Sequence, residues 1–484
     1  MRTLWLLTGL AVVQSCSSTK VSSEPQPSHY RLFILTQLQG ELEPCGCSLE
    51  PLGGLARLAT YLDQHKDPAQ TPVLIAHGDL VSPGKVSAGS VPQIKKAGEF
   101  LQRQLLGLGL VISGFGEDDE ALERDAKALR TVTETPWLER DALRTAQGIQ
   151  FVRGRITQKL DPKRPVVMLF DGDIKEAKAQ AAALQAAGVD LVILSKPHEE
   201  PAISELAEGI YALVGGERGQ KLLDVTLTWR GGALIRLEGA GERQAALDAM
   251  QARIEGLVKQ RDRAKVRQKP PALLAARTAQ VERAKAQRKR LLETPLPKPP
   301  KQGSSLSGQR VPLDSSIAQN ETMNQAIQSH HRAISTLNKQ LESTRQCPQT
   351  NAPDQAQYVG SVACQGCHQE AYALWKKTPH AKAWATLERK GRTYDYTCVG
   401  CHSAGFEQPG GFCRVSEAGA RVNVGCESCH GPGSLHIAQA GKGPIKRKVS
   451  AEDCTQCHHP PHTNTFVYED RLQRVLGPGH QAAP

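Results

Sequence analysis

Residues 364–368 read Cys-Gln-Gly-Cys-His, and the same Cys-x-x-Cys-His pattern returns at 398–402, 426–430 and 454–458. This pattern is typical of covalent attachment of c-type haem. Two residues between the thiols let both sulfurs reach the two vinyl groups on one porphyrin edge, and the adjacent His then binds the iron from its proximal side. We therefore expect four haems, held by Cys364, Cys367, Cys398, Cys401, Cys426, Cys429, Cys454 and Cys457, with His368, His402, His430 and His458 as proximal ligands.

Structural zinc is the main alternative, because paired Cys-x-x-Cys units also make tetrahedral metal sites. Four repeats that each end in His, in a chain with an apparent export signal, favour haem. A domain held by disulfides alone would not need a His after every second Cys.

The composition of the segment limits which residues can be the second axial ligand of each iron. All four Met residues precede this segment, which excludes Met ligation from within it. Five of its nine His are not proximal, and His459 directly follows His458 and cannot easily turn to the same iron. We expect mostly bis-His haems, and a haem without a distal His would be open to a small ligand. The distal candidates are His380, His436, His462 and His480.

The haem segment spans residues 354–484, is poor in regular periodicity and has few large apolar side chains. A segment of ~130 residues with so few could hardly build an adequate core. We therefore expect a mostly helical or irregular domain whose core is the cofactors, and which does not fold without them.

Residues 30–240 show a different pattern, in which short β-rich runs alternate with amphipathic helical runs. This alternation predicts a layered α/β domain. The last two strands are expected to form a hairpin joined by Arg230-Gly231-Gly232. The expected strands are Tyr30–Thr36, Val73–Ala76, Leu110–Ser113, Val166–Phe170, Asp190–Ser195, Tyr211–Val214, Leu222–Trp229 and Ala233–Leu237.

Residues 241–353 are expected to form a helical spacer, which makes the chain multidomain. A long helical pattern begins at Glu242 and is broken at Pro270-Pro271. Residues Pro295–Gly308 have the composition of a linker, and a second helix is predicted for Ile317–Leu341.

The N-terminus has the features of an export signal: Arg2, an apolar run from Leu4 to Val13, and a Cys after Ser15. The run is too short to span a bilayer. The Cys resembles that of a bacterial lipobox, so we expect a signal peptide over 1–16, lipidation of Cys16 and a tether over 17–29. An ordinary signal peptide is the alternative. The chain is expected to lie on the periplasmic side of a bacterial membrane, anchored by its lipid.

The formal net charge is +11, and twelve Lys or Arg lie between Lys259 and Arg290. This stretch is rich in Ala and Gln and lacks aromatic residues, which favours a solvated helix face over a nucleic-acid interface. No nucleic-acid partner is expected. An anionic membrane surface or an acidic redox partner remains open.

The haem segment resembles the tetrahaem cytochrome c-554 family. The similarity is carried by residues 358–368 with the following Tyr372, Trp375, Thr378 and His380, by 398–406 and by 426–436. The resemblance implies that His380 and His436 are distal ligands to other haems. It also implies that the haem on His402 is five-coordinate.

The α/β region resembles calcineurin-like metallophosphoesterases of the 5′-nucleotidase type, through Gly53–Arg57 and Val73–Asp79. Those enzymes hold two metal ions, and the resemblance places Gln37 and Gln39 at D-x-H positions. Gly116-Glu117-Asp118 stands near G-N-H and Gly216–Gly219 near G-H-x-H, so that Asp79 and His198 remain. We expect no dimetal centre, and a binding or docking domain in preference to an active phosphatase.

Four cysteines remain outside the haem motifs and the lipidation site: Cys45, Cys47, Cys347 and Cys413. An even count in an oxidising compartment suggests two disulfides, with the pairing open. Metal binding or thiol chemistry by Cys45 and Cys47 is the alternative.

The leading hypothesis is an electron-transfer protein that works between redox partner proteins through four haems, with the α/β domain as a docking or ligand-binding module. Two alternatives are an enzyme that converts a small nitrogen or sulfur compound at an open haem, and a phosphoesterase with a fused redox domain.

Overall fold

The computed structural model describes residues 28–480 except 45–50, 85–87, 127–128, 131, 133, 197–201, 267–269, 348–353, 460–462, 464–465 and 478. The expected signal peptide and Cys16 lie outside the described residues, as do residues 17–27 of the tether. The same holds for Cys45, Cys47, His198 and His462.

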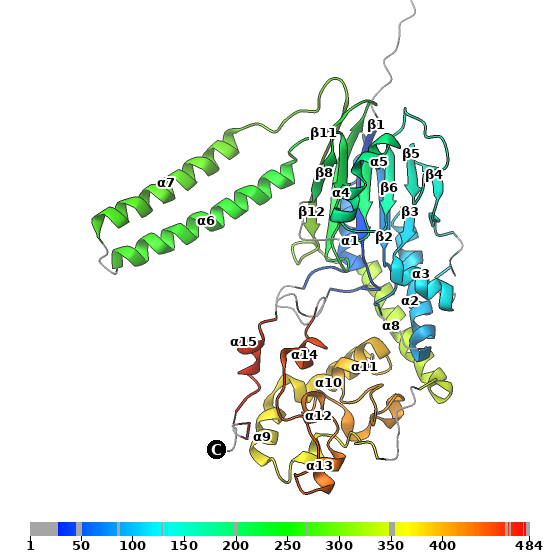
Figure 1. The fold of residues 1–484 in the computed structure, drawn as a ribbon, viewed down its shortest axis with the longest axis vertical. Helices are drawn as coiled ribbons and strands as arrows, with labels where there is room; N and C mark the ends of the chain where they lie inside the picture. Colours follow the sequence, from blue (N-terminus) through cyan, green and yellow to red (C-terminus); the bar gives the residue numbers. More distant parts are fainter. Residues whose placement is uncertain are drawn as a thin grey trace, which may run out of the picture.

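The α/β domain contains two six-stranded sheets (Figure 1). The first has the order β11-β12-β10-β1-β2-β3 and the second β4-β5-β6-β7-β9-β8. The first sheet is made of β11 (Leu234–Arg236), β12 (Ser304–Pro312), β10 (Lys221–Trp229), β1 (Ser28–Thr36), β2 (Thr71–Gly78) and β3 (Leu110–Phe115). The second is made of β4 (Ala142–Ala146), β5 (Ile149–Arg153), β6 (Val166–Phe170), β7 (Leu191–Leu194), β9 (Ile210–Leu213) and β8 (Ile203–Ala207).

The two sheets pack face to face, which explains why their central strands are apolar on both sides. Leu32 and Val73 of the first sheet share a buried cluster with Phe151 and Val167 of the second. The outer face of the second sheet is covered by α4 (Ile174–Ala179) and α5 (Ala181–Ala186). The layered α/β fold predicted from the sequence is confirmed.

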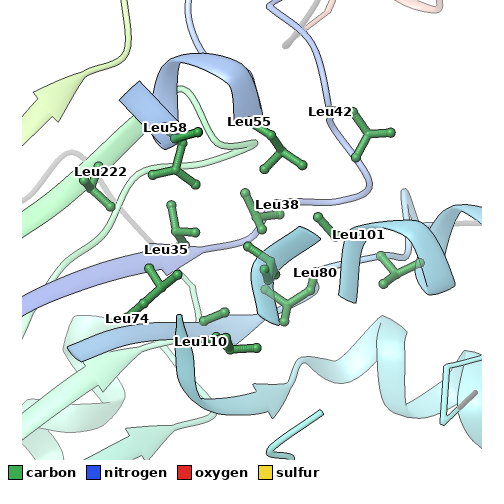
Figure 2. Close-up of a cluster of buried hydrophobic side chains, with 14 of the residues drawn as sticks. Leu35, Leu38, Leu42, Leu55, Leu58, Leu74, Leu80, Leu101, Leu110 and Leu222 are labelled. Atoms are coloured by element: carbon green, nitrogen blue, oxygen red, sulfur yellow. The ribbon is translucent and has the colours of Figure 1, made fainter. Parts of the chain in front are cut away.

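The outer face of the first sheet is covered by three helices: α1 (Leu55–Gln64), α2 (Val91–Gly107) and α8 (Glu321–Leu341). Figure 2 shows the leucines of this layer, with Leu35 and Leu74 from strands facing Leu58 and Leu101 from helices. Burial of this apolar surface fixes the end of β1, from which residues 37–43 run toward the C-terminal region.

The expected hairpin between β10 and β11 is wrong. β12 lies between them, antiparallel to β10 and parallel to β11. Residues 304–308, expected as part of a linker, therefore belong to the sheet. Ser304 and Leu306 are fully buried in the sheet. The Ser- and Gly-rich sequence shows little apolar alternation, so it does not reveal the strand.

The expected spacer is likewise divided. Helices α6 (Ala240–Val266) and α7 (Pro271–Glu293) form an antiparallel hairpin that projects from the sheet (Figure 1). In contrast, α8 packs on the α/β domain, where Met323 and Ile327 are buried. An amphipathic helix needs an apolar surface to cover, and the first sheet with α1 and α2 supplies it.

The C-terminal region consists of short helices and loops. Its one buried apolar cluster among the described residues surrounds the second motif and includes Trp384, Val399 and Phe412. A disulfide between Cys347 and Cys413, with a Cα–Cα distance of 5.7 Å, joins the chain after α8 to this region. In the described part of the chain, no helix combines the length and apolarity needed to cross a membrane.

Candidate haem-attachment sites

Each Cys-x-x-Cys-His motif lies on a helical turn or next to one. The second and third motifs end α11 (Tyr396–His402) and form α12 (Cys426–His430). In the first and fourth, the backbone N–H of the His donates to the carbonyl of the first Cys, at 3.0 Å for His368 and 2.9 Å for His458. A helical turn places both thiols and the His on one side of the chain, as covalent haem attachment requires. All eight motif thiols are free of disulfides.

Two of the proximal imidazoles are oriented by backbone carbonyls. The Nδ1 atom of His402 lies 2.7 Å from the carbonyl of Ala383, and that of His430 lies 2.7 Å from the carbonyl of Lys446. A carbonyl accepts only, so Nδ1 carries the proton and Nε2 keeps its lone pair. This is the arrangement in which a His ligates a metal through Nε2.

Two proximal imidazoles face a second imidazole across a gap. The ring centroids of His368 and His436 are 6.4 Å apart with an interplanar angle of 21°, and those of His380 and His458 are 6.1 Å apart. One metal–imidazole bond of about 2 Å on each side, together with the ring radii, gives a separation of roughly 6 Å. The residues therefore fit two bis-His irons. Burial, followed by the neighbouring His458, lowers the pKa of His380, which favours its neutral form.

A third grouping involves the C-terminal His480. Its pKa is lowered by burial and by the nearby imidazoles of His430 and His368. His368 already faces His436, so His480 is a candidate for the distal ligand of the third motif.

His402 differs from the other three proximal residues. Among the described residues, its recorded polar neighbours are Ala383 and the hydroxyl of Thr386, 3.2 Å from Nδ1, and no second imidazole is recorded against it. Both contacts are on the Nδ1 side, away from the atom that would bind iron.

The motifs are packed closely in pairs. A hydrogen bond between the thiols of Cys364 and Cys426 raises the pKa of Cys364 and lowers that of Cys426 to about 6. A hydrogen bond to Cys401 raises the pKa of Cys457. In the haem-loaded protein these sulfurs would form the thioether bonds. The thiol contacts place the first motif next to the third and the second next to the fourth.

Glu427, inside the third motif, is a structural residue that the sequence pattern conceals. Its buried carboxylate accepts hydrogen bonds from the backbone N–H groups of Val359, Gly360 and Gly433, at 2.7–3.0 Å. It thereby fixes the start of the first motif against the third. In the Cys-x-x-Cys-His pattern this position is one of the two variable residues. The acidic residue there was the only sequence signal of its structural role.

The α/β domain presents a polar cluster at the end of β1, which includes Gln37, one of the positions singled out in the sequence. The Gln37 side-chain amide donates to Asp79 Oδ2 at 3.3 Å and to the carbonyl of Ser195 at 2.8 Å. Asp79 Oδ1 accepts from the backbone N–H groups of Asp118 and Asp119. An amide N–H thus lies against the carboxylate that would otherwise face a cation.

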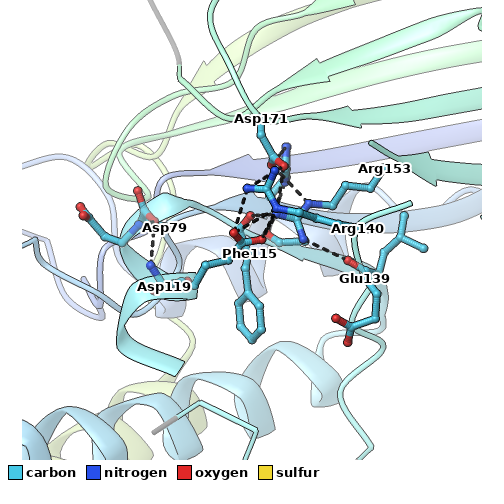
Figure 3. A network of polar contacts seen from close by, with 12 residues as sticks. Asp79, Phe115, Asp119, Glu139, Arg140, Arg153 and Asp171 are labelled. Carbon is cyan, nitrogen blue, oxygen red and sulfur yellow. Dashed lines mark hydrogen bonds and ion pairs between the residues drawn. The ribbon is translucent and has the colours of Figure 1, made fainter. Parts of the chain in front are cut away.

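The carboxylates beyond Asp79 are also neutralised by side chains. Figure 3 shows Arg153, which is buried and pairs with Asp171 at 3.0 Å and with Glu120 at 2.5 Å. Arg140 pairs with the same Glu120 at 2.8 Å. Among the described residues, no group of three or more His, Cys, Asp or Glu has the arrangement of a metal site. His198 lies outside the described residues.

Comparison with known proteins identifies the C-terminal region. Residues 363–431 match the family described as cytochrome c554 and c-prime. Cytochrome c-554 of Nitrosomonas europaea is 40% identical over 93 residues, which cover 16% of this chain and 40% of the relative. The C-terminal region is cytochrome c-554-like. The chain thus spans less than half the length of this relative, and the cytochrome c-554-like region is a small part of the chain.

Solved structures similar to the chain include a 5′-nucleotidase precursor and an NAD nucleotidase. A 5′-nucleotidase precursor of Thermus thermophilus is 13% identical with a TM-score of 0.34, covering 64% of this chain and 59% of that one. The NAD nucleotidase of Haemophilus influenzae is 11% identical with a TM-score of 0.31, covering 43% and 56%. At this similarity neither activity nor substrate transfers to this chain.

Proposed function

We propose that this protein passes electrons between redox partner proteins through four covalently bound c-type haems. The facing imidazoles of His368 with His436 and of His380 with His458 carry this proposal. Bound haem supplies a one-electron centre, and two strong axial ligands leave no coordination site for a substrate. Residues with this arrangement favour electron transfer over conversion of a bound molecule.

The close packing of the motifs supports transfer within the chain. The Cys364–Cys426 and Cys401–Cys457 thiol contacts bring the attachment edges together in two pairs, and burial and then the neighbouring Cys454 raise the pKa of Cys429. Neighbouring attachment sites give an electron short steps from one site to the next. We assign His368, His402, His430 and His458 as proximal ligands, and His436, His480 and His380 as distal ligands of the first, third and fourth irons.

A second function is conversion of a small nitrogen or sulfur compound. Only the surroundings of His402 favour it. His368 and His458 each face a second imidazole, and His480 is the candidate for His430, whereas His402 has no ring contact with an imidazole among the described residues. His462 lies outside the described residues and is the remaining candidate for this position. Phosphoesterase activity is not favoured, because the Gln37 amide lies against Asp79.

We infer that the protein is exported, held on the periplasmic side of a bacterial membrane by a lipid on Cys16, and that its α/β domain docks a partner or binds a ligand. The signal-like N-terminus supports export.

The test is a spectroelectrochemical titration of the full chain, monitored by electron paramagnetic resonance. We expect four haems, of which three are low-spin and one is high-spin, each reduced in a one-electron step. A preparation without covalently bound haem, or with haem that no donor reduces, would overturn the proposal. A low-spin signal from all four would exclude the enzyme alternative.

A further inference from the structure

Asp395 holds a buried negative charge at the beginning of the helix that carries the second motif. Its side chain is 3% exposed and caps α11, accepting from the backbone N–H of Thr397 at 3.2 Å and from its hydroxyl at 2.6 Å. A carboxylate at a helix N-terminus is stabilised by the free N–H groups and the helix dipole. The charge therefore persists despite burial.

The α/β domain reaches this carboxylate directly. Gln93 of α2 donates from its amide nitrogen to Asp395 at 2.6 Å, and its amide oxygen accepts from the backbone N–H of Tyr396 at 3.1 Å. Asn338 of α8 donates to the same Gln93 oxygen at 2.6 Å. Gln93 is buried, so the interface closes over the start of the motif helix and excludes water from it.

A charge bridge crosses the same interface. Arg392 pairs with Asp395 at 2.7 Å and, across the boundary, with Glu43 at 3.1 Å. Glu43 follows β1 and also contacts His331 at 3.0 Å and Gln328 at 2.7 Å, both on α8. The segment that carries Glu43 begins at Gln37 and Gln39, so the loop that follows β1 ends on the C-terminal region.

These charges lie next to the second attachment site. The pKa of Cys398 is raised by burial and then by the Asp395 carboxylate, while Arg392 acts in the opposite direction. The sulfur that would carry one edge of the haem therefore senses both charges. Water and salt screen buried charges only weakly, so the charges of Asp395 and Arg392 act on this sulfur.

We propose that the α/β domain, through Glu43, Arg392 and Asp395, holds down the reduction potential of the haem on His402. Each carboxylate places a negative charge beside the site, and Arg392, together with Lys390 near Glu43, offsets part of it. Reduction adds an electron there, so this charge favours the ferric form. The inference rests on the proposed haem function and makes the three residues tuning residues, not catalytic ones.

The test compares the unmodified full chain with Asp395→Asn and Glu43→Gln in a redox titration of the haem-loaded protein. Each variant keeps the side-chain shape and removes one negative charge. In Asp395→Asn we expect the ferrous-to-ferric ratio of one haem, at fixed ambient potential, to rise about tenfold, which is about 59 mV for a one-electron couple. Glu43→Gln is expected to shift the same haem by about threefold, because its charge is farther away and partly exposed.

The matched control is Glu417→Gln, which removes a carboxylate that pairs with Arg414 at 3.0 Å elsewhere in the same region. No haem is expected to shift in this variant. The inference is overturned if Glu43→Gln leaves all potentials unchanged, or if every haem shifts equally in both variants. Absence of reducible haem in the unmodified chain would instead overturn the proposed function.

Discussion

The imidazole rings of His380 and His458 lie 6.1 Å apart, although His380 belongs to the beginning of the C-terminal region and His458 to its last motif. In the proposed assignment, a distal ligand from one motif's neighbourhood thus serves the iron of another motif. Long-range pairs of this kind tie the ends of a region that has little apolar core of its own.

Replacing His380 with Ala is expected to leave the haem on His458 covalently attached and to remove its sixth ligand. The thioether bonds depend on Cys454 and Cys457, which the change does not touch. Electron paramagnetic resonance should show one additional high-spin ferric haem. His459→Ala is the control and should leave the spin states unchanged, since His459 adjoins His458 in the chain; an identical spectrum for both variants would contradict the pairing.

Cyanide or nitric oxide is expected to bind one haem of the unmodified protein, the one on His402. His368 and His458 each face a second imidazole, and the proposal assigns His480 to His430. Optical titration should therefore give a spectral change equivalent to one of four haems. A ligand-induced change in several haems at once would show that the assigned distal residues do not bind iron.

Glu427→Ala is expected to lower the free energy of unfolding of the haem region by roughly 2–5 kcal/mol, because it leaves buried N–H groups without an acceptor. The carboxylate accepts from three backbone groups. Thermal unfolding followed by haem absorbance measures the loss. Glu417→Gln, at an exposed ion pair, should change stability by less than about 1 kcal/mol; equal losses in both variants would contradict the bracing role.

Removing the disulfide with Cys347→Ser and Cys413→Ser is expected to cost about 4 kcal/mol by the loop-entropy relation. The closed loop spans a sequence separation of 66 residues. Denaturant unfolding of the double variant, compared with the unmodified chain under oxidising conditions, tests this. An unchanged midpoint would mean that the α8–haem interface already restricts the loop.

The free energy of unfolding of the α/β domain is expected to fall as the pH rises from about 4 to about 6, because Asp190 ionises. Burial raises the pKa of this carboxyl to about 6, so the folded state binds its proton more tightly than the unfolded state. Its contribution is present below the unfolded pKa and is lost as the pH rises through the folded one. The loss is roughly 1–3 kcal/mol.

Asp190→Asn keeps an oxygen for the backbone N–H of Val166 and cannot ionise. The difference in unfolding free energy between this variant and the unmodified chain should therefore grow from pH 4 to pH 6 and then stay constant. Other buried carboxyls, such as Glu41, titrate equally in both proteins and cancel in the difference. A difference independent of pH would contradict the assignment.

The sequence by itself determined the covalent sites, because Cys-x-x-Cys-His is a local device whose residues need one helical turn. It also predicted the α/β layering, since apolar runs such as Val166–Phe170 are buried wherever the strand is placed. It did not reveal β12, whose place depends on pairing with β10 and β11. The Ser- and Gly-rich stretch there has no strong pattern of its own.

Only the tertiary structure decided which His faces which, and what adjoins the second motif. The composition left four distal candidates, and the resemblance implied a role for two of them without pairing either to an iron. The contact of Arg392 with Glu43 joins residues nearly a whole chain apart, and no local pattern encodes it. Such pairings depend on how elements distant in the sequence pack together. A charge or an imidazole can pair with any suitable group, and the tertiary structure decides which group lies close to it.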